Sequence, residues 1–474
     1  MPPTDPPARS LERAADAARA SPATRPPAPD VRRPGAARIR RGGVRLAAAA
    51  AGLLALLFLA TFFHRVLDIT RGSPVEVLPG ATPSDAGLAP AGARFPSLLT
   101  ALGEVTLVAG HDVEILVDGA ATFRRIFDDM RAATLSITLQ SYYCENGALL
   151  DRFAAILAER ARAGVRVHVV ADGFGCRDFA SRHADALRAA CVEFAVLRPL
   201  RWFTFHRAQH RSHVRLVVVD GRVAYTGGFG LADVWLTGDG VGWRDTNVRF
   251  EGPAVRTAQG AFIAAWAEAT GALLTDEALL PHAAAATAAS ADTRAAVQFG
   301  GPGLGTTPFE RTLALTIGGA RERLYIANAY FIPSPPVRAL LADAARRGVD
   351  VRLLTAGPRS DLPGTRIAAR AYFGELLDAG VRIYEYLPTM MHAKTWVADG
   401  VWAGIGSMNL DNRSLRLNDE LNLLLLDSAH GAALERQFHV DLEHAREIDA
   451  ASHDQRPWSQ RLQERVVTWV APFL

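Results

Sequence analysis

The strongest chemical signal in the sequence is a short pattern near residue 392. His392 and Lys394 stand two residues apart, Asp399 follows after four more, and Gly-Ser-Met-Asn ends at Asn409. On a strand, residues i and i+2 share a face, so the histidine and the lysine would point the same way. A turn after Asp399 would bring back a partner strand carrying Ser407 and Asn409. An imidazole, an ammonium, a hydroxyl and an amide would then converge, and these groups can bind a tetrahedral phosphate and attack it.

Lys394 is the only lysine among the 52 basic residues of the chain. Guanidinium supplies every other basic side chain, so the single ammonium is a candidate for a task that needs a compact point charge. A lone His-x-Lys pattern on a strand is more often a half-exposed polar face. The unique lysine, the trailing Gly-Ser-x-Asn and a second copy of the pattern favour chemistry instead.

The second copy lies earlier in the chain and is altered. In order, it consists of His213, Arg215, Asp220, Gly227, Gly228 and Gly230. Arg215 stands in the place of the lysine, and Gly230 in the place of the asparagine. Arginine can still bind phosphate oxygens through its planar fork, and backbone N–H groups of the glycines are candidates to replace the missing amide. We expect this half-site to be active but altered, with an inactive first half as the alternative.

The segments around the two motifs repeat each other. A strand at 134–144, an amphipathic helix and a strand at 165–173 precede the first motif, and 321–333, a helix and 349–357 precede the second. Each half continues with another helix and strand and ends in the β-rich segment that carries its motif. Such self-similarity predicts two duplicated α/β halves.

Two pairs of helix ends support the duplication. Gly164 and Gly348 follow the matching helices of the two halves, as is typical of the left-handed residue after a helix. Cys191 stands where the second half has Gly380 and is unfavourable there if the backbone needs a positive φ.

The chain has three cysteines, Cys144, Cys176 and Cys191, without C-x-x-C spacing. Their odd number and spacing argue against a disulfide framework or a zinc site. We expect buried small hydrophobic side chains.

With both motifs in place, the chain resembles the phospholipase D superfamily, and its bacterial cardiolipin synthase branch in particular. The resemblance runs from about residue 105 to the C-terminus and includes the fragments YFIP, MHAKTWVADG and IGSMNLDNRSLRLNDELNLL. It implies two tandem α/β repeats related by a pseudo-twofold axis and a mechanism without metal or other cofactor. One histidine would attack phosphorus to form a phosphohistidine. The other would protonate the leaving alcohol and then deprotonate the incoming alcohol or water. Which histidine attacks is left open.

The resemblance also implies an acidic partner that orients each histidine. We assign Glu420 to His392 and Asp245 to His213, each with a solvated carboxylate or a structural salt bridge as the alternative. The expected catalytic set is His213, His392, Lys394, Asp220, Asp399, Glu420 and Asp245. The expected phosphate-binding set is Arg215, Ser407, Asn409, Gly227 and Gly228.

The N-terminal region predicts a membrane anchor. Residues 1–45 are rich in proline, alanine and arginine and read as a disordered cytoplasmic tail. An uncharged apolar run then predicts a transmembrane helix over 46–66. Arginines concentrated before it would leave the rest of the chain on the outer, periplasmic side of a bacterial cytoplasmic membrane. A cleaved signal peptide and a soluble helix are the alternatives. The expected division of the remainder is a linker at 67–105, a first domain at 106–271, a linker at 272–296 and a second domain at 297–474.

Composition and context narrow the substrate. A net charge of +3 without a long basic stripe argues against nucleic acid. The segment 198–207 places aromatic residues among arginines, which suits an interface with anionic headgroups, although an ordinary packed loop explains it nearly as well. Together with this context, the resemblance to the cardiolipin synthase branch implies a membrane-anchored phosphatidyltransferase that joins two phosphatidylglycerols into cardiolipin and releases glycerol. A hydrolytic phospholipase D and an inactive lipid-binding homologue are the alternatives.

Overall fold

The computed structural model describes residues 47–63, 88–201, 208–236, 242–281, 292–302 and 306–468. The expected tail at 1–45 lies outside the described residues. So do residues 202–207, which carry the aromatic side chains of the segment 198–207.

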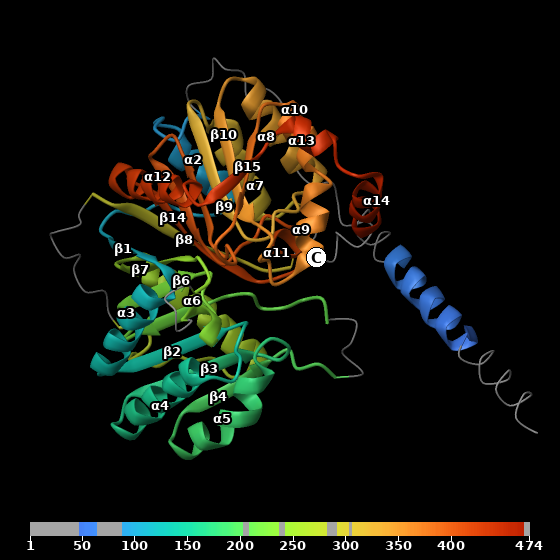
Figure 1. Ribbon diagram of the computed structural model, residues 1–474. Helices are drawn as coiled ribbons and strands as arrows, with labels where there is room; N and C mark the ends of the chain where they lie inside the picture. Colours follow the sequence, from blue (N-terminus) through green and yellow to red (C-terminus); the bar gives the residue numbers. More distant parts are fainter. Residues whose placement is uncertain are drawn as a thin grey trace, which may run out of the picture. The chain divides into compact units, whose positions relative to one another are not determined.

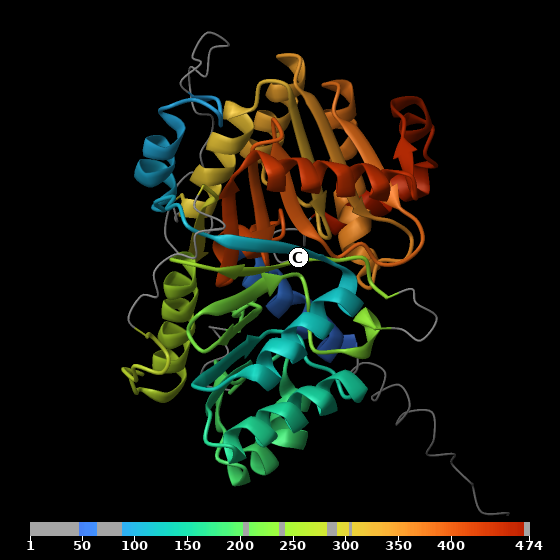
Figure 2. The same ribbon diagram turned by 90° about the vertical axis from the view of Figure 1, so that its left-hand side faces the viewer.

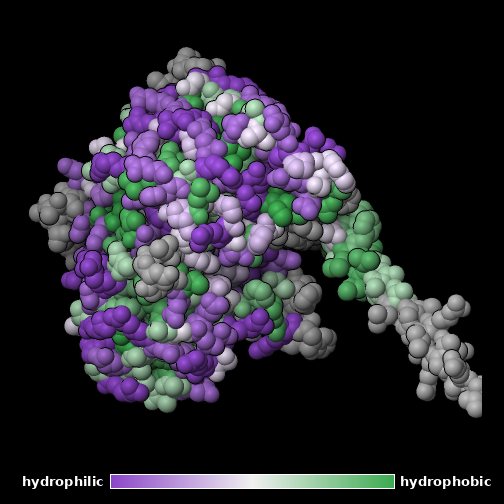
Figure 3. All heavy atoms as spheres, viewed as in Figure 1, coloured by the Kyte–Doolittle hydropathy of each residue, from purple (hydrophilic) through white to green (hydrophobic). Residues whose placement is uncertain are grey.

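Residues 47–63 form a helix in a unit of their own, because the chain divides at residue 70. Apolar side chains cover this helix (Figure 3), and its leucines and phenylalanines are exposed. Among the described residues, no helix combines the length and the apolar character that crossing a membrane requires. The expected spanning helix over 46–66 is not supported by the described residues, and residues 46 and 64–66 lie outside them.

The first half of the remaining chain forms a seven-stranded sheet in the order β1-β7-β6-β5-β2-β3-β4 (Figure 1). Its strands are β1 (Asp112–Val117), β2 (Ser136–Ser141), β3 (Arg166–Asp172), β4 (Glu193–Leu197), β5 (Leu216–Val219), β6 (Val223–Gly227) and β7 (Thr246–Glu251). β2, β3 and β4 are parallel, and β5, β6, β7 and β1 continue the sheet as antiparallel neighbours. The accompanying helices are α3 (Asp118–Ala132), α4 (Ala148–Arg162), α5 (Arg177–Ala189), a short 3-10 turn η3 (Asp233–Trp235) and α6 (Ala254–Thr270).

The second half forms an eight-stranded sheet in the order β15-β11-β10-β9-β12-β13-β14-β8. Its strands are β8 (Arg294–Gly300), β9 (Arg323–Asn328), β10 (Asp350–Ala356), β11 (Arg382–Tyr386), β12 (Lys394–Ala398), β13 (Trp402–Gly406), β14 (Glu420–Leu426) and β15 (Ala445–Ile448). The helices around it are α2 (Phe95–Gly103), α7 (Pro308–Gly319), α8 (Pro335–Arg346), α9 (Pro363–Arg370), α10 (Phe373–Asp378), α11 (Asn412–Arg416), α12 (Ser428–Leu442), α13 (Ala450–Asp454) and α14 (Trp458–Val467).

The two sheets share one topology apart from β15, which extends the second sheet beyond β11. The strands β7-β6-β5-β2-β3-β4 match β14-β13-β12-β9-β10-β11 in order, and β1 and β8 flank them in the same way. The expected duplication of α/β halves is therefore confirmed. The strands carrying the motifs, β5 and β12, are buried throughout, although β12 begins with the polar residues Lys394 and Thr395.

One hydrophobic core lies between the two sheets. It includes Val218 and Phe250 from the first sheet and Val397 and Leu423 from the second, together with residues of α6 and α12. Separate cores lie under the outer helices of each half. Figures 1 and 2 show the two halves stacked on each other with α12 lying along the second sheet. The motif strands thus lie next to the boundary between the halves.

The predicted helix ends agree with the backbone. Gly164 and Gly348 have φ of 90° and 93°, and Gly380 has 95°. Cys191 has φ 67°, so the cysteine does occupy a left-handed position that glycine fills in the second half.

The expectation for the cysteines was wrong in two respects. Cys144 and Cys176 form a disulfide, and Cys191 is exposed rather than buried. The bridge forms because β2 and β3 are adjacent parallel strands, so the residues that follow them meet at one sheet edge. There the Cys144 N–H donates to the Gly175 carbonyl at 3.1 Å. Spacing along the chain does not show this proximity.

Candidate functional site

The backbone of each motif histidine contacts the opposite half of the molecule. The His213 N–H donates to the Asp419 carbonyl at 2.9 Å, and the His392 N–H donates to the Arg244 carbonyl at 2.7 Å. Isolated parallel bridges join Ser212 to Asp419 and Arg244 to Met391. Because the two sets of contacts are reciprocal, the half-sites face each other across a pseudo-twofold axis.

The carboxylate partners are crossed between the halves. The His213 Nδ1–H donates to Glu420, at 2.8 Å to Oε1, and the His392 Nδ1–H donates to Asp245 Oδ2 at 3.3 Å. All four side chains are buried. The sequence-based pairing assigned Glu420 to His392 and Asp245 to His213, so the structure exchanges the two histidine–carboxylate pairs. The exchange follows from the bridges above, which place each motif histidine beside the segment that precedes the opposite β14 or β7.

The two cations occupy matching places. Lys394 Nζ donates to the carbonyl of His392 at 2.5 Å, and Arg215 Nη1 donates to the carbonyl of His213 at 3.2 Å. Both side chains are buried, and Arg215 Nε has no hydrogen-bond partner among the described residues. Arginine therefore replaces lysine in position and in its backbone contact, while one N–H remains for a ligand.

Ser407 contacts the carboxylate rather than the pocket. Its hydroxyl donates to Glu420 Oε2 at 2.5 Å. In the first half, Gly228 takes the place of this serine, and the Trp235 Nε1–H donates to Asp245 Oδ2 at 2.8 Å instead. The assignment of Ser407 to phosphate binding is thus corrected, because its hydroxyl is committed to a buried anion.

The glycines of the first motif make room for neighbouring side chains. A Cβ on Gly230 would lie 2.7 Å from Cη2 of Trp235, and one on Gly228 would lie 2.3 Å from Oδ1 of Asp245. Gly227 has φ 149° and packs against Asn247. Gly227 and Gly228, assigned to phosphate binding from the sequence, are not among the residues that line the pocket described below.

Asp220 and Asp399 lie away from the histidines, which corrects their place in the catalytic set. Each directly follows its motif strand, and an extended chain of seven residues would put Asp220 roughly 20 Å from His213. Asp220 accepts hydrogen bonds from the backbone N–H groups of residues 134–136, and Asp399 from those of 321–323. Both have a left-handed φ, of 53° and 52°. These aspartates therefore tie the turn of the motif hairpin to the start of β2 or β9.

Burial shifts the titration of the whole cluster. Loss of solvation, followed by the charges of Arg215 and Lys394, lowers the pKa of both histidines well below the ordinary value. Burial and the charge of Arg215 lower the pKa of Lys394 to about 7. Burial raises the pKa of Glu420 to about 7 and raises that of Asp245. Both imidazoles are therefore neutral near pH 7, and the positive charges of Arg215 and Lys394 lie beside the two carboxyl groups.

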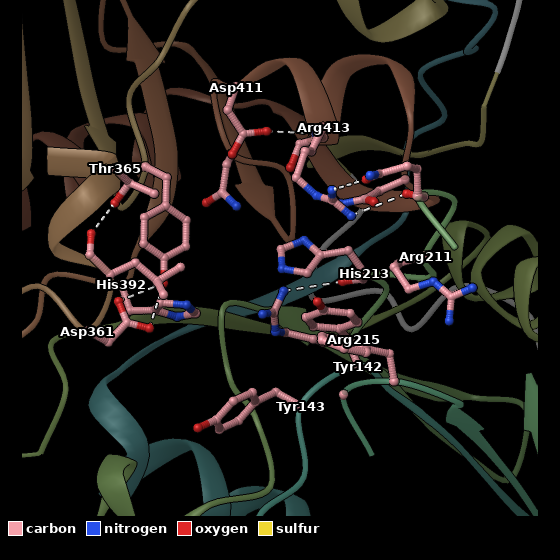
Figure 4. A pocket seen from close by; sticks show the side chains of 18 of the residues that line it. Tyr142, Tyr143, Arg211, His213, Arg215, Asp361, Thr365, His392, Asp411 and Arg413 are labelled. Atoms are coloured by element: carbon pink, nitrogen blue, oxygen red, sulfur yellow. Dashed lines mark hydrogen bonds between the residues drawn. The ribbon is translucent and has the colours of Figure 1, made fainter. Parts of the chain in front are cut away.

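A cavity of about 650 Å³ opens between the halves and is lined by both histidines (Figure 4). Arg215 and Asn409 also line it, whereas Lys394 does not, and Asn409 Oδ1 has no hydrogen-bond partner among the described residues. Further lining residues, which sequence reasoning did not assign to the site, include Tyr142, Tyr143, Trp235, Trp243, Tyr330, Asp361, Asp411 and Arg413.

Aromatic rings enclose the two imidazoles. The Tyr142 ring lies 4.9 Å from that of His213, and the rings of Trp235 and Trp243 lie 5.3 and 5.2 Å from that of His392. Trp235 and Trp243 lie between the first motif and Asp245, whereas Tyr142 follows the strand expected at 134–144, so the wall combines residues from separate segments.

Comparison with known proteins gives a consistent result. Residues 313–442 match the family model described as "Cardiolipin synthase, PLD-like domain". A cardiolipin synthase of Geobacillus kaustophilus is 35% identical over 381 residues, covering 79% of this chain and 74% of the relative. Cardiolipin synthase A of Pseudomonas entomophila is 32% identical over 380 residues, covering 79% of this chain and 77% of the relative. Among solved structures, phosphatidylserine synthase of Haemophilus influenzae has a TM-score of 0.62 at 15% identity, over 80% of this chain and 99% of that one, which shows the shared fold.

Proposed function

The chain belongs to the cardiolipin synthase family of phospholipase D-like proteins, and from this we propose that it joins two phosphatidylglycerols into cardiolipin and releases glycerol. The observation that carries the proposal is the crossed pair of buried histidines. Each has Nδ1 bonded to a carboxylate of the opposite half, which leaves Nε2 for chemistry.

In the proposed mechanism, the phosphate of the first phosphatidylglycerol binds near Arg215 and Lys394. The Nε2 of one histidine attacks phosphorus, and the P–O bond to glycerol breaks as the other histidine donates a proton to the leaving oxygen. That second histidine then accepts the proton of the incoming hydroxyl of another phosphatidylglycerol. This oxygen forms a P–O bond while the P–N bond breaks, which regenerates the first imidazole. Glu420 and Asp245 act as positioning residues that hold each ring in one tautomer.

The neutral form of the histidines suits the attacking step, because an unprotonated imidazole is the nucleophile. The proton donor must be charged when the alcohol leaves. An anionic phosphate bound beside it favours that charge, which burial otherwise opposes. The two rings therefore titrate as a coupled pair.

The test is to incubate the full chain with phosphatidylglycerol vesicles and to measure the lipid products by mass spectrometry. Cardiolipin and glycerol in equal amounts support the transferase. Phosphatidic acid in place of cardiolipin would mean that water is the acceptor, as in a hydrolase. If His392→Gln and His213→Gln retain turnover, the phosphohistidine mechanism is wrong.

Residence at a bacterial cytoplasmic membrane, with residues after the apolar helix on the outer side, is also part of the proposal. The exposed apolar surface of the helix at 47–63 supports contact with lipid, and the Cys144–Cys176 disulfide supports an oxidising compartment. Alkaline extraction of membranes and protease treatment of spheroplasts test the attachment and the side. We also propose that the two phospholipase D-like domains extend over residues 106–271 and 297–474.

A further inference from the structure

The last helix of the described chain, α14, has two unlike faces. Its inner face packs on α9: Val467 joins a small cluster with Ala368, and buried Glu464 pairs with Arg456 at 3.1 Å. Its outer face exposes Trp458, Leu462 and Val466, which are 73%, 53% and 61% exposed. Because these residues are four apart, they form one stripe along the helix.

The charge beside this stripe is positive. Arg461 and Arg465 are exposed on the same helix, whose only carboxylate, Glu464, is buried. A cavity of about 500 Å³ between α9 and α14 is lined by arginines on the α9 side. Arg366 and Arg370, with Arg446 of β15, share the single buried carboxylate of Glu385, so this cluster has an excess of positive charge.

Helix α9 contacts both α14, through Ala368, and the histidine pocket, through Thr365. Leu362, which directly precedes α9, lines the pocket and is 51% exposed. Phe174 and Leu200 also line the pocket and are exposed. Figure 1 shows α14 beside α9 at the edge of the second half.

We propose that α14 docks on the surface of an anionic bilayer, with Trp458, Leu462 and Val466 among the acyl chains and Arg461 and Arg465 at the headgroups. An amphipathic helix with an aromatic residue and arginines has the composition that binds such an interface. Docking would bring the apolar rim of the pocket to the lipid, so that a phospholipid enters without crossing water. This inference rests on the proposed lipid substrate.

The direct test uses a local probe, because the apolar helix at 47–63 can bind membranes by itself. In a Cys191→Ser background of the full chain, Leu462→Cys is labelled with an environment-sensitive dye and mixed with phosphatidylglycerol vesicles. We expect a blue shift and quenching by lipids that carry a quencher on the acyl chain, both weaker with phosphatidylcholine. The matched control is Leu273→Cys, at a site that is 69% exposed and outside the pocket, where neither change is expected. If the dye at 462 does not respond while the protein sediments with vesicles, or if 273 responds equally, the proposal is overturned.

A second test compares two forms of the substrate. We expect Trp458→Ser/Leu462→Ser/Val466→Ser to lower the ratio of activity on vesicles to activity on monomeric short-chain phosphatidylglycerol by about tenfold or more, because three apolar side chains lose their lipid contact. The control Leu135→Ser/Leu273→Ser/Val440→Ser removes three exposed apolar side chains elsewhere and should leave the ratio unchanged. Equal ratios in both variants would overturn the docking. If the wild-type chain converts neither form, the proposed function fails while the dye experiment still decides the docking.

Discussion

At the scale of single residues, the crossed carboxylates make each half-site depend on the other half. Glu420→Gln removes a negative charge that lies 2.8 Å from His213 Nδ1. We expect the pKa of His213 to fall further, and kcat to fall by about 10³- to 10⁴-fold because the ring loses its fixed tautomer. NMR of labelled histidines, assigned with His213→Gln and His392→Gln, measures the shift. Asp245→Asn is the matched control and should lower the pKa of His392 rather than that of His213. If Glu420→Gln shifts the pKa of His392 instead of that of His213, the crossed pairing is wrong.

The pH dependence of turnover follows from two buried groups. As the pH falls below about 7, Glu420 becomes protonated, so its negative charge no longer stabilises the hydrogen bond from the His213 Nδ1–H. As the pH rises above about 7, Lys394 loses its positive charge. We therefore expect a narrow bell in kcat/KM centred near pH 7. Bound phosphate favours the charged amine, so the falling limb of kcat should lie at a higher pH. Lys394→Arg should remove that limb, since arginine stays protonated; an unchanged limb would show that another group causes it.

Arg215 tests whether the first half-site needs a guanidinium. Lys394 makes the same contact with the carbonyl of its own motif histidine, so a lysine at 215 has a precedent for its geometry. We expect Arg215→Lys to keep kcat/KM within about tenfold and Arg215→Met to lose about 10²-fold or more. A collapse in both variants would mean that the site requires the two-pronged fork.

At the scale of elements, the turn after β6 has glycine at position 230, where the indole ring of Trp235 leaves no room for a larger side chain. Gly230→Ala would place a Cβ 2.7 Å from Cη2 of that ring, so we expect the free energy of unfolding to fall by about 1–3 kcal/mol. Activity should fall as well, because Trp235 holds Asp245. The matched control is Gly260→Ala inside α6, where a Cβ meets no atom within 4 Å, and it should gain about 0.5–1 kcal/mol. Denaturant unfolding measures both, and equal stabilities would contradict the packing argument.

At the scale of the whole molecule, the disulfide holds one wall of the pocket. It joins the segment after β2, which carries Tyr142, to the segment after β3, which carries Phe174. Cys144→Ser/Cys176→Ser should lower the free energy of unfolding by about 2–4 kcal/mol and weaken turnover, because the wall is less constrained. Cys191→Ser is the control and should change neither. If reductant leaves the melting temperature of the wild-type chain unchanged, the bridge contributes nothing to stability.

The sequence by itself predicted the repeated α/β halves and the motif strands, and it singled out both histidines and Lys394. Local periodicity and spacing within one segment indicate these features, whereas Glu420 and Asp245 were proposed from the resemblance to the phospholipase D superfamily. The left-handed position of Cys191 was also visible, because the second half shows a glycine there.

Only the tertiary structure decided which groups meet. The exchange of Glu420 and Asp245 between His213 and His392 depends on backbone bridges between segments about 150 to 200 residues apart, and no local pattern encodes such pairs. The same holds for the Cys144–Cys176 bond, which needs two adjacent strands. Asp220 and Asp399 share a motif with the histidines, yet an extended strand carries them to its far end, where they bind backbone instead. Proximity in sequence specifies an element, whereas the packing of one half against the other specifies the site.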